Sequence, residues 1–312
     1  MIRHLRSLCD LDAPEMKRLI DLAIDVKAHP EAYQDKLAGK SIATIYAKPS
    51  TRTRVSFEVG INQLGAHPLV LSKSGAGSMQ SARGETNSDT AKVLSRYVDA
   101  IVIRTHEQSE IDELAEFGTV PVINALSDSY HPCQALADVL TLRERFATPR
   151  DLKVVFVGPG NNVAHSLLLA GPRAGFDVVC SCPQNLPPNP EIFAIAEANA
   201  KAAGTKVGIE HDVLQAVQGA RCVYTDTWVS MGQELEGLQL HEQLRNYTVN
   251  SQVMQAAAAD AVFMHCLPAH RGEEVTPNVL DGPQSIVFDQ AENRLHAQKA
   301  MLMLLLGAEP WS

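Results

Sequence analysis

Nearly continuous apolar runs, many of them rich in β-branched residues, recur along the chain with turn residues around them. Runs of this kind are typical of strands covered on both faces, whereas a half-exposed strand alternates apolar and polar residues. Segments with helical spacing separate the runs, and this alternation predicts an α/β fold with mostly parallel sheets flanked by helices. Clear runs occupy residues 41–47, 100–103, 120–123, 153–157, 177–182, 221–225 and 261–264.

The apolar runs fall into two groups, residues 41–124 and 153–288, on either side of a helix-like segment at 133–146. A chain of 312 residues is also about twice the size of a typical domain of roughly 150 residues. We therefore predict a domain boundary near residue 148 and a final helix after the second group. The predicted parts are residues 1–148, 149–290 and 291–312.

The composition is that of a soluble globular protein, with 45% hydrophobic residues, 20% charged residues and a net charge of −9. No tract of Lys and Arg occurs, so nucleic acid and anionic membranes are poor partners. The longest apolar run, 300–306, is too short to span a bilayer, and the first residues lack the apolar stretch of a signal peptide. We therefore expect a cytoplasmic protein that binds neither membranes nor nucleic acid.

The six cysteines include no CxxC pair, so a structural zinc site is not expected, and most should be small buried side chains. Cys266 differs because it follows the run at 261–264, and open α/β sheets bind ligands at the carboxyl ends of their strands. It is a candidate active-site thiol, with a buried loop cysteine as the alternative. His265, Cys266 and His270 lack the second ligand group of a zinc finger, which disfavours a metal site.

A segment rich in hydroxyl and guanidinium groups, Lys48 to Arg54, follows the first predicted strand and precedes an amphipathic run. Hydroxyls and backbone N–H groups at a helix N-terminus favour an anion. Arg52 or Arg54 can add a bidentate clamp on a phosphate group. The alternative is a helix that is capped by Ser50 or Thr51 and carries two exposed arginines.

The segment at 131–134 opens the long helix between the two groups, and Pro132 suits a first helical position. His131 and Gln134 would then lie near the helix N-terminus. His can donate to a carbonyl oxygen, and Gln can both donate and accept. The alternative is a capping segment with a satisfied polar His.

Asp226 directly follows the run at 221–225, where it can hold an ammonium group. Ser230 and the backbone N–H of Met231 can hold polar parts of the same ligand. The alternative is a simple turn that ends at Gly232.

A glycine-containing turn, Gly158 to Asn162, follows the run at 153–157 and invites comparison with dinucleotide-binding loops. The fingerprint fails because position 163, where a third glycine is needed, is Val. The next run also ends without an Asp or Glu for a ribose hydroxyl. The two asparagines suit a carboxylate or amide on a small ligand.

Each motif is weak alone, but their combination and order are specific. The chain resembles the aspartate/ornithine carbamoyltransferase superfamily over nearly its whole length. Two places depart from the superfamily pattern. Pro159 stands where Asp is common, and the loop at 72–85 follows the pattern only loosely. Within that loop, Gln80 is the best match for the glutamine of the superfamily. The matching segments are STRTR at 50–54, Arg104, HPCQ at 131–134, GNN at 160–162, DTWVSMG at 226–232, HCLPAHR at 265–271 and AENR at 291–294.

Within the superfamily, the second half of the chain favours the ornithine branch. HCLP stands where the aspartate enzymes carry an HPLPR-type segment, and DxxxSMG at 226–232 is the ornithine-type signature. Asp226 favours free ornithine over N-acetylornithine, because acylation removes the charge that this acid would meet. Putrescine is the alternative that is harder to exclude. It lacks the α-carboxylate that Asn162 and the Met231 backbone are expected to bind.

The resemblance implies transfer of the carbamoyl group of carbamoyl phosphate to the δ-amine of L-ornithine, giving L-citrulline and phosphate in arginine biosynthesis. The phosphate would lie at a helix N-terminus, and hydrogen-bond donors would stabilise the oxyanion at the carbonyl. The implied roles are phosphate binding by Ser50, Thr51, Arg52 and Thr53, donation to the carbonyl oxygen by Thr53, Arg104 and His131, acceptance from the carbamoyl NH₂ by Gln134 and the Leu267 carbonyl, and added positive charge from Arg294.

For ornithine, the resemblance implies that Asp226 and Ser230 meet the α-ammonium, while Asn162 and the Met231 N–H meet the α-carboxylate. Cys266 would lie beside the δ-amine and the carbamoyl group. A protonated amine cannot attack. Cys266 and Asp226 can position the δ-amine or remove its proton, and the departing phosphate can be the final proton acceptor. The sequence does not choose between these possibilities.

The superfamily's assembly implies a homotrimer with shared active sites, in which Gln80 acts in a neighbouring subunit. The final helix would pack on the first domain, and neither a metal nor an organic cofactor is implied. Two other classes stay open. One is a dinucleotide oxidoreductase, which binding of NAD(P)H would reveal, and the other is a catalytically silent relative that binds another enzyme.

Overall fold

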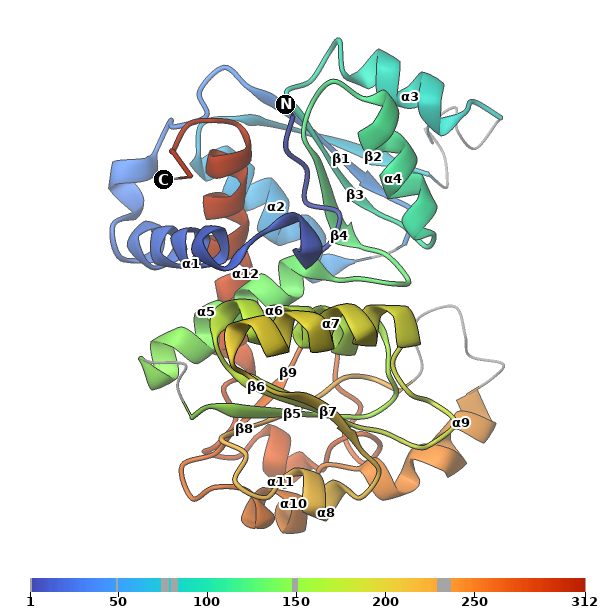
Figure 1. Cartoon of the computed structure of the whole chain (residues 1–312). Coiled ribbons are helices and arrows are strands. Elements are labelled where there is room, and N and C mark those ends of the chain that lie inside the picture. Colours follow the sequence, from blue (N-terminus) through green and yellow to red (C-terminus); the bar gives the residue numbers. More distant parts are fainter. Residues whose placement is uncertain are drawn as a thin grey trace. The chain divides into compact units, whose positions relative to one another are not determined.

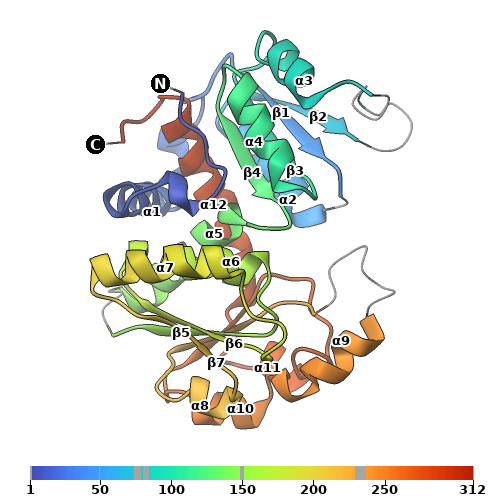
Figure 2. The same ribbon diagram turned by 45° about the vertical axis from the view of Figure 1, so that its right-hand side comes forward.

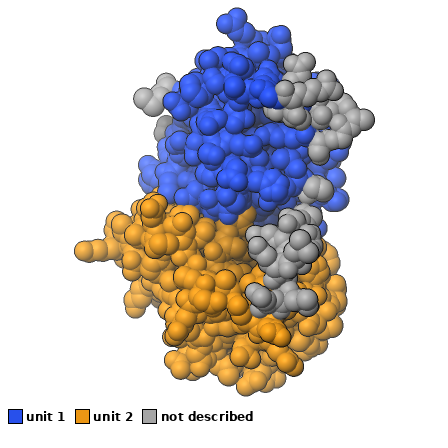
Figure 3. Space-filling model, turned by 90° about the vertical axis from the view of Figure 1, so that its right-hand side faces the viewer, with its two compact units in different colours: residues 1–140, 292–312 blue, residues 141–291 orange. Residues whose placement is uncertain are grey.

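A computed structural model describes residues 2–48, 50–73, 79, 84–147, 151–228 and 237–311. The chain forms two compact units, which Figure 3 distinguishes by colour. Unit 1 contains Met1–Leu140 and Glu292–Ser312, and unit 2 contains Thr141–Ala291. Residue 148, where the sequence predicts a boundary, lies outside the described residues, and that boundary stays a prediction.

Unit 1 is built on a four-stranded parallel sheet with the order β2-β1-β3-β4. One face is covered by α3 and α4, whose Ala91, Ile111 and Leu114 pack on the apolar side chains of β1 and β3. The other side carries α1, α2 and α12 (Figure 1). The strands are β1 (Ser41–Tyr46), β2 (His67–Ser72), β3 (Ala100–Arg104) and β4 (Val122–Leu126).

Local sequence explains where the helices of unit 1 begin. Asp12 and Glu15 form a capping box at the start of α1, each side chain accepting from the other's backbone N–H. Ser50 caps α2 by accepting from the Thr53 N–H. The longer helices are α1 (Ala13–Ala28), α2 (Thr51–Gln63), α3 (Asn87–Leu94), α4 (Gln108–Phe117), α5 (Pro132–Phe146) and α12 (Val287–Leu305), and short 3₁₀ helices occupy Leu8–Asp10 and Pro30–Tyr33.

Unit 2 is built on a five-stranded parallel sheet with the order β7-β6-β5-β8-β9. The chain winds outward from β5 first to one side and then to the other. The crevice at such a reversal, at the carboxyl ends of β5 and β8, is where open α/β sheets bind ligands. The strands are β5 (Lys153–Val157), β6 (Asp177–Ser181), β7 (Val207–Glu210), β8 (Cys222–Thr225) and β9 (Val262–His265).

Helices cover both faces of this second sheet. Figures 1 and 2 show α6 and α7 on one face and α8, α10 and α11 on the other. The second face is sealed by apolar side chains that include Val155, Val223 and Phe263. The helices are α6 (Asn162–Ala174), α7 (Pro190–Ala203), α8 (Val213–Ala216), α9 (Gly237–Leu244), α10 (Ser251–Ala256) and α11 (Pro277–Leu280), with a 3₁₀ helix at Arg245–Tyr247.

The predicted fold class is confirmed, and two strands lie outside the apolar runs that predicted it. β2 contains Pro68 and β7 contains Gly208, and both strands lie at an edge of their sheet. Edge strands are partly exposed and do not need a continuous apolar run. Among the described residues, no helix is both long and apolar enough to cross a membrane. Four cysteines are buried as predicted, whereas Cys9 is exposed.

Candidate active site

In unit 1, two guanidinium groups converge on the hydroxyl of Thr53 in the first turn of α2. Arg104 Nη1 donates to Thr53 Oγ1 at 3.4 Å, and Arg294 Nη2 donates to the same oxygen at 3.3 Å. All three residues are at least 92% buried, since their exposed fractions are 8%, 4% and 1% for Arg104, Arg294 and Thr53. A β-bulge between Ile103 and Arg104 marks the end of β3. The charges and the helix N-terminus together favour an anion here.

Gln134, in the first turn of α5, links this cluster to a buried carboxylate. Its Oε1 accepts from Arg294 Nη1 at 2.7 Å, and its Nε2 donates to Asp138 Oδ1 at 2.9 Å. These two bonds set the orientation of the amide, with its oxygen toward the arginine. That oxygen has a second lone pair for a ligand N–H group.

His131 precedes α5 and is 5% exposed. Burial lowers the pKa of His131 well below its ordinary value of 6.5, and the charges of Arg294 and Arg104 lower it further. The ring is therefore neutral at pH 7. A neutral imidazole keeps one N–H that can donate to a carbonyl oxygen without adding charge.

The start of α2 presents further groups at the edge of this cluster. Ser50 Oγ accepts from the Thr53 N–H at 3.2 Å, and its own hydroxyl proton can still be donated. Thr51 is exposed, and Arg52 is half-buried. Lys48, to which the sequence analysis assigned no role, lies near the same cluster. Burial lowers the pKa of its ammonium group, and the nearby Arg104 charge lowers it further.

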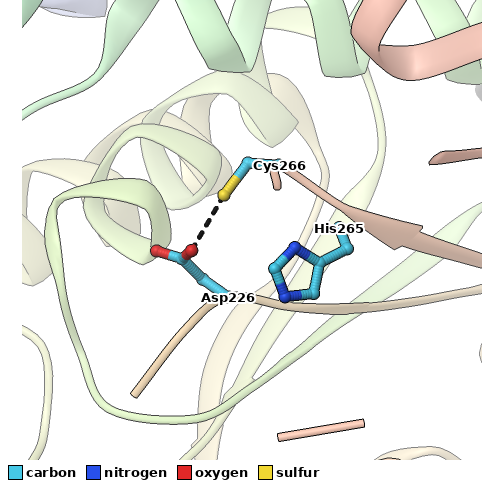
Figure 4. A group of neighbouring side chains, drawn as sticks. All are labelled: Asp226, His265 and Cys266. Carbon is cyan, nitrogen blue, oxygen red and sulfur yellow. Dashed lines mark hydrogen bonds between the residues drawn. The ribbon is translucent and has the colours of Figure 1, made fainter. Parts of the chain in front are cut away.

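In unit 2, Asp226 and Cys266 lie side by side at the carboxyl ends of the neighbouring strands β8 and β9 (Figure 4). The Cys266 thiol donates to Asp226 Oδ1 at 2.8 Å, and the Thr227 N–H donates to the same oxygen at 2.8 Å. Asp226 is 8% exposed, and Cys266 is half-buried. A largely buried carboxylate at a strand end is suited to an ammonium group.

Asn161 holds the other carboxylate oxygen of Asp226. Its Nδ2 donates to Asp226 Oδ2 at 2.9 Å, while its Oδ1 caps α6 by accepting from the N–H groups of Val163 and Ala164. A Cβ on Gly160 would lie 2.1 Å from Pro188 N, so only glycine permits this close approach of the loop. Asn161 thus positions the acid, whereas the sequence assigned a ligand role to its neighbour Asn162, which begins α6.

His265 and Glu274 form a fully buried pair that the sequence did not identify as part of the site. The Leu267 N–H donates to His265 Nδ1 at 2.8 Å, so the ring proton belongs on Nε2, which lies 3.1 Å from Glu274 Oε1. Leu267 has a positive φ of 57°. A non-glycine residue is held in this sparsely populated conformation only by its surroundings, so the pair fixes the backbone next to Cys266.

The structure gathers predicted residues and their newly found partners in two clusters, one within each unit. Cys266 and Leu267, which the sequence assigned to the same ligand as the arginines, belong to unit 2. Gln80, Ser230 and Met231 lie outside the described residues, and their roles stay predictions. The cluster of unit 1 contains Thr53, Arg104, His131, Gln134 and Arg294, and that of unit 2 contains Asn161, Asp226, His265, Cys266 and Glu274.

Two family models match the chain. The carbamoyl-P binding domain of the aspartate/ornithine carbamoyltransferases matches residues 3–144, and the Asp/Orn binding domain of the same family matches residues 150–305. Together they cover most of the chain and both clusters.

Similar proteins agree with the family models. The chain is 50% identical to an ornithine carbamoyltransferase of Symbiobacterium thermophilum, with 98% of both chains covered. It is 49% identical to an anabolic ornithine carbamoyltransferase of Pyrococcus furiosus, covering 98% of this chain and 96% of that one. The solved structure of ornithine carbamoyltransferase from Pyrococcus furiosus matches 99% of this chain and 98% of that one with a TM-score of 0.94. The chain therefore belongs to the aspartate/ornithine carbamoyltransferase family.

Proposed function

We propose that the protein transfers the carbamoyl group of carbamoyl phosphate to the δ-amine of L-ornithine, giving L-citrulline and phosphate in arginine biosynthesis. Relatives that are about half identical over nearly the full length carry the name ornithine carbamoyltransferase, and one of them is anabolic. The observation that carries the proposal is that the chain contains one cluster suited to each substrate. A buried arginine cluster suits a phosphorylated donor, and a buried carboxylate beside a thiol suits an amine acceptor.

In unit 1, carbamoyl phosphate would meet groups that match each of its parts. Its phosphate lies at the start of α2, against Ser50, Thr51, Arg52 and Thr53, where N–H groups and positive charge favour an anion. Arg104 and the neutral His131 ring donate hydrogen bonds to its carbonyl oxygen. These donors stabilise the charge that forms on this oxygen as the amine attacks, and losing one typically costs about 10²–10³ in rate.

In unit 2, ornithine would be recognised through its α-ammonium and α-carboxylate groups. Asp226 pairs with the α-ammonium, with Ser230 beside it, while Asn162 and the Met231 N–H take the α-carboxylate. The neutral δ-amine attacks the carbonyl carbon, a C–N bond forms, and the C–O bond to phosphate breaks. The attacking nitrogen loses one proton, and Cys266, Asp226 and the departing phosphate are its candidate acceptors.

The assignment extends to the domains and the assembly. Residues 1–148 with 291–312 would bind carbamoyl phosphate, and residues 149–290 would bind ornithine, in a cytoplasmic homotrimer with Gln80 contributed by a neighbouring subunit. Exposed apolar side chains on α2 and on the edge strand β2 support self-association. These are Val55, Val59, Leu69 and Val70, with exposed fractions of 52%, 40%, 36% and 38%.

A citrulline assay with the purified protein and carbamoyl phosphate tests the proposal directly. L-Ornithine, putrescine and N-acetylornithine are offered separately at equal concentrations, and the ratio of their kcat/KM values is measured. Ornithine should be used far better than either analogue. A clear preference for putrescine or N-acetylornithine would assign a different acceptor, and no product from any amine would refute carbamoyl transfer.

A further inference from the structure

The chain between β6 and α7 lies directly against the loop that carries Asn161. The Gly160 N–H donates to the Leu186 carbonyl at 2.9 Å. A Cβ on Gly160 would collide with the backbone of Pro188, so the two backbones are in contact without any side chain between them. Residues 186–189, called the proline segment below, therefore support this loop from one side.

The proline segment is stiff and is anchored at both of its ends. Prolines at 187, 188 and 190 fix the φ angles of the backbone there and restrict the residues that precede them. Leu186 packs against the apolar cluster that seals the second face of the sheet. At the other end, the Asn189 side chain caps α7. A segment held in this way keeps a fixed position on which a neighbouring loop can rest.

His165 of α6 ties the proline segment to the same loop. Its ring is 7% exposed, and its Nε2 accepts from the Asn189 N–H at 2.9 Å. Because Nε2 is an acceptor, a neutral ring carries its proton on Nδ1. The His165 N–H donates to the Asn161 carbonyl at 2.8 Å. One residue is thus bonded both to the proline segment and to the residue that caps α6, and Figure 2 shows α6 and α7 on the same face of the sheet.

These supports act on the carboxylate of Asp226 through Asn161. Asn161 Nδ2 donates to Asp226 Oδ2 at 2.9 Å, while its Oδ1 accepts from two N–H groups at the start of α6. The amide cannot move without either leaving Asp226 or uncapping the helix. The position of the amide is therefore set by the contacts of Gly160 and His165 with the proline segment.

We propose that His165 is a positioning residue for ornithine, which acts with the proline segment to hold Asn161 and through it Asp226. The inference rests on the proposed function, because it takes Asp226 as the partner of the α-ammonium group. The bonds join three segments that are separate in the sequence, so residue spacing alone does not reveal the connection.

A purely structural histidine is the competing explanation, and kinetics separate the two. Replacing a structural residue lowers the melting temperature and the amount of active protein, but leaves KM for ornithine unchanged in the molecules that fold. Replacing a positioning residue raises KM for ornithine, since the contact with the substrate is weakened. Binding of carbamoyl phosphate, whose proposed contacts lie in unit 1, is unchanged in both cases.

The experiment compares His165→Leu with His165→Gln in the full chain. Leucine removes the acceptor for the Asn189 N–H, whereas the amide oxygen of glutamine can take the place of Nε2. His165→Leu should raise KM for ornithine roughly fivefold to tenfold, the effect of about one lost hydrogen bond. It should lower kcat less than it raises KM. His165→Gln should restore KM to the wild-type value.

A second measurement follows the placement of Asp226 without any carbamoyl transfer. The Cys266 thiol donates to Asp226 Oδ1 at 2.8 Å, so its availability to iodoacetamide reports on the carboxylate. Cys9→Ser serves as the background, because Cys9 is exposed and the other four cysteines are buried. Alkylation of Cys266 should become roughly fivefold faster after His165→Leu, as that hydrogen bond weakens. His165→Gln should leave the rate unchanged.

The matched control is Gln284→Leu, which removes another hydrogen bond from a side chain to the backbone of unit 2, at 2.9 Å to the Ala261 carbonyl. It should change neither KM nor the alkylation rate. Thermal unfolding identifies any variant that has lost its fold. If His165→Leu is one of them, Pro188→Ala, which loosens the proline segment, provides the same test and should shift both measurements in the same direction.

The proposal is overturned if folded His165→Leu and Pro188→Ala proteins keep the wild-type KM and alkylation rate. It is also overturned if His165→Gln is impaired as much as His165→Leu, because the acceptor would then not matter. A wild-type protein that makes no citrulline would instead refute the proposed function. In that case faster alkylation after His165→Leu would still support the placement of Asp226 by His165.

Discussion

Asp226→Asn isolates the charge on which the choice of ornithine depends. The change keeps the size and shape of the side chain and removes one negative charge. Because Asp226 is only 8% exposed, its pairing with an ammonium group resembles a buried ion pair, whose disruption costs about 3–5 kcal/mol. At about 1.4 kcal/mol per factor of ten, kcat/KM for ornithine should fall roughly 100- to 4,000-fold.

The structure also predicts a separate effect on stability. Asp226 accepts from Cys266 and Thr227 at one oxygen and from Asn161 at the other. An asparagine has only one acceptor, so its NH₂ group must face at least one of these donors. Leaving a buried polar group unmatched costs about 1–3 kcal/mol, which should lower the melting temperature.

A matched variant separates charge from position. Asn161→Ser can still cap α6 but loses the donor to Asp226 Oδ2, so it weakens the placement of the acid while keeping its charge. It should lose much less ornithine activity than Asp226→Asn. Activity is followed by citrulline formation, and binding of carbamoyl phosphate is followed by calorimetry.

Carbamoyl phosphate binding should survive Asp226→Asn, because its proposed contacts in unit 1 are unchanged. The reasoning is refuted if Asp226→Asn keeps kcat/KM for ornithine within tenfold of the wild type. It is also refuted if carbamoyl phosphate binding falls as much as ornithine use does, because the residue would then act on the whole protein rather than on ornithine.

Three further predictions concern unit 1. Arg52→Ala should weaken carbamoyl phosphate binding roughly 10- to 150-fold, the equivalent of a charged hydrogen bond of about 1.5–3 kcal/mol; unchanged affinity in a calorimetric titration would exclude the contact. Mixing inactive Gln80→Ala and Arg104→Ala subunits should restore part of the citrulline activity, since some hybrid sites carry both intact residues, and no recovery despite proven subunit exchange would argue against a shared site. Burial lowers the pKa of His131, so below its ordinary value of 6.5 the unfolded chain takes up a proton that the folded chain does not, and stability falls as pH decreases. Urea unfolding at pH 5.5 and 7.5 should show a steeper loss for the wild type than for His131→Gln, and equal slopes would contradict a buried neutral ring.

The sequence by itself determined the fold class and the position of most strands. The run at 153–157 coincides with β5, because a central strand covered on both faces needs an unbroken apolar segment. Capping was equally local: Asp12 and Ser50 each bond to a backbone N–H three residues later in the chain. The order of motifs indicated the carbamoyltransferase family, which the family models and similar proteins confirm.

Only the tertiary structure decided which of these residues meet. Strand order places β8 between β5 and β9, so Asn161, Asp226 and Cys266 become neighbours although long segments separate them in the chain. The pairing of His265 with Glu274 depends on how a turn folds back on β9. Apolar periodicity reports how much of a segment is buried, whereas the partner of a buried polar group depends on which distant segment is packed against it. For that reason the sequence identified Asp226 and Cys266 as candidates, and the fold revealed the side chains that hold them in place.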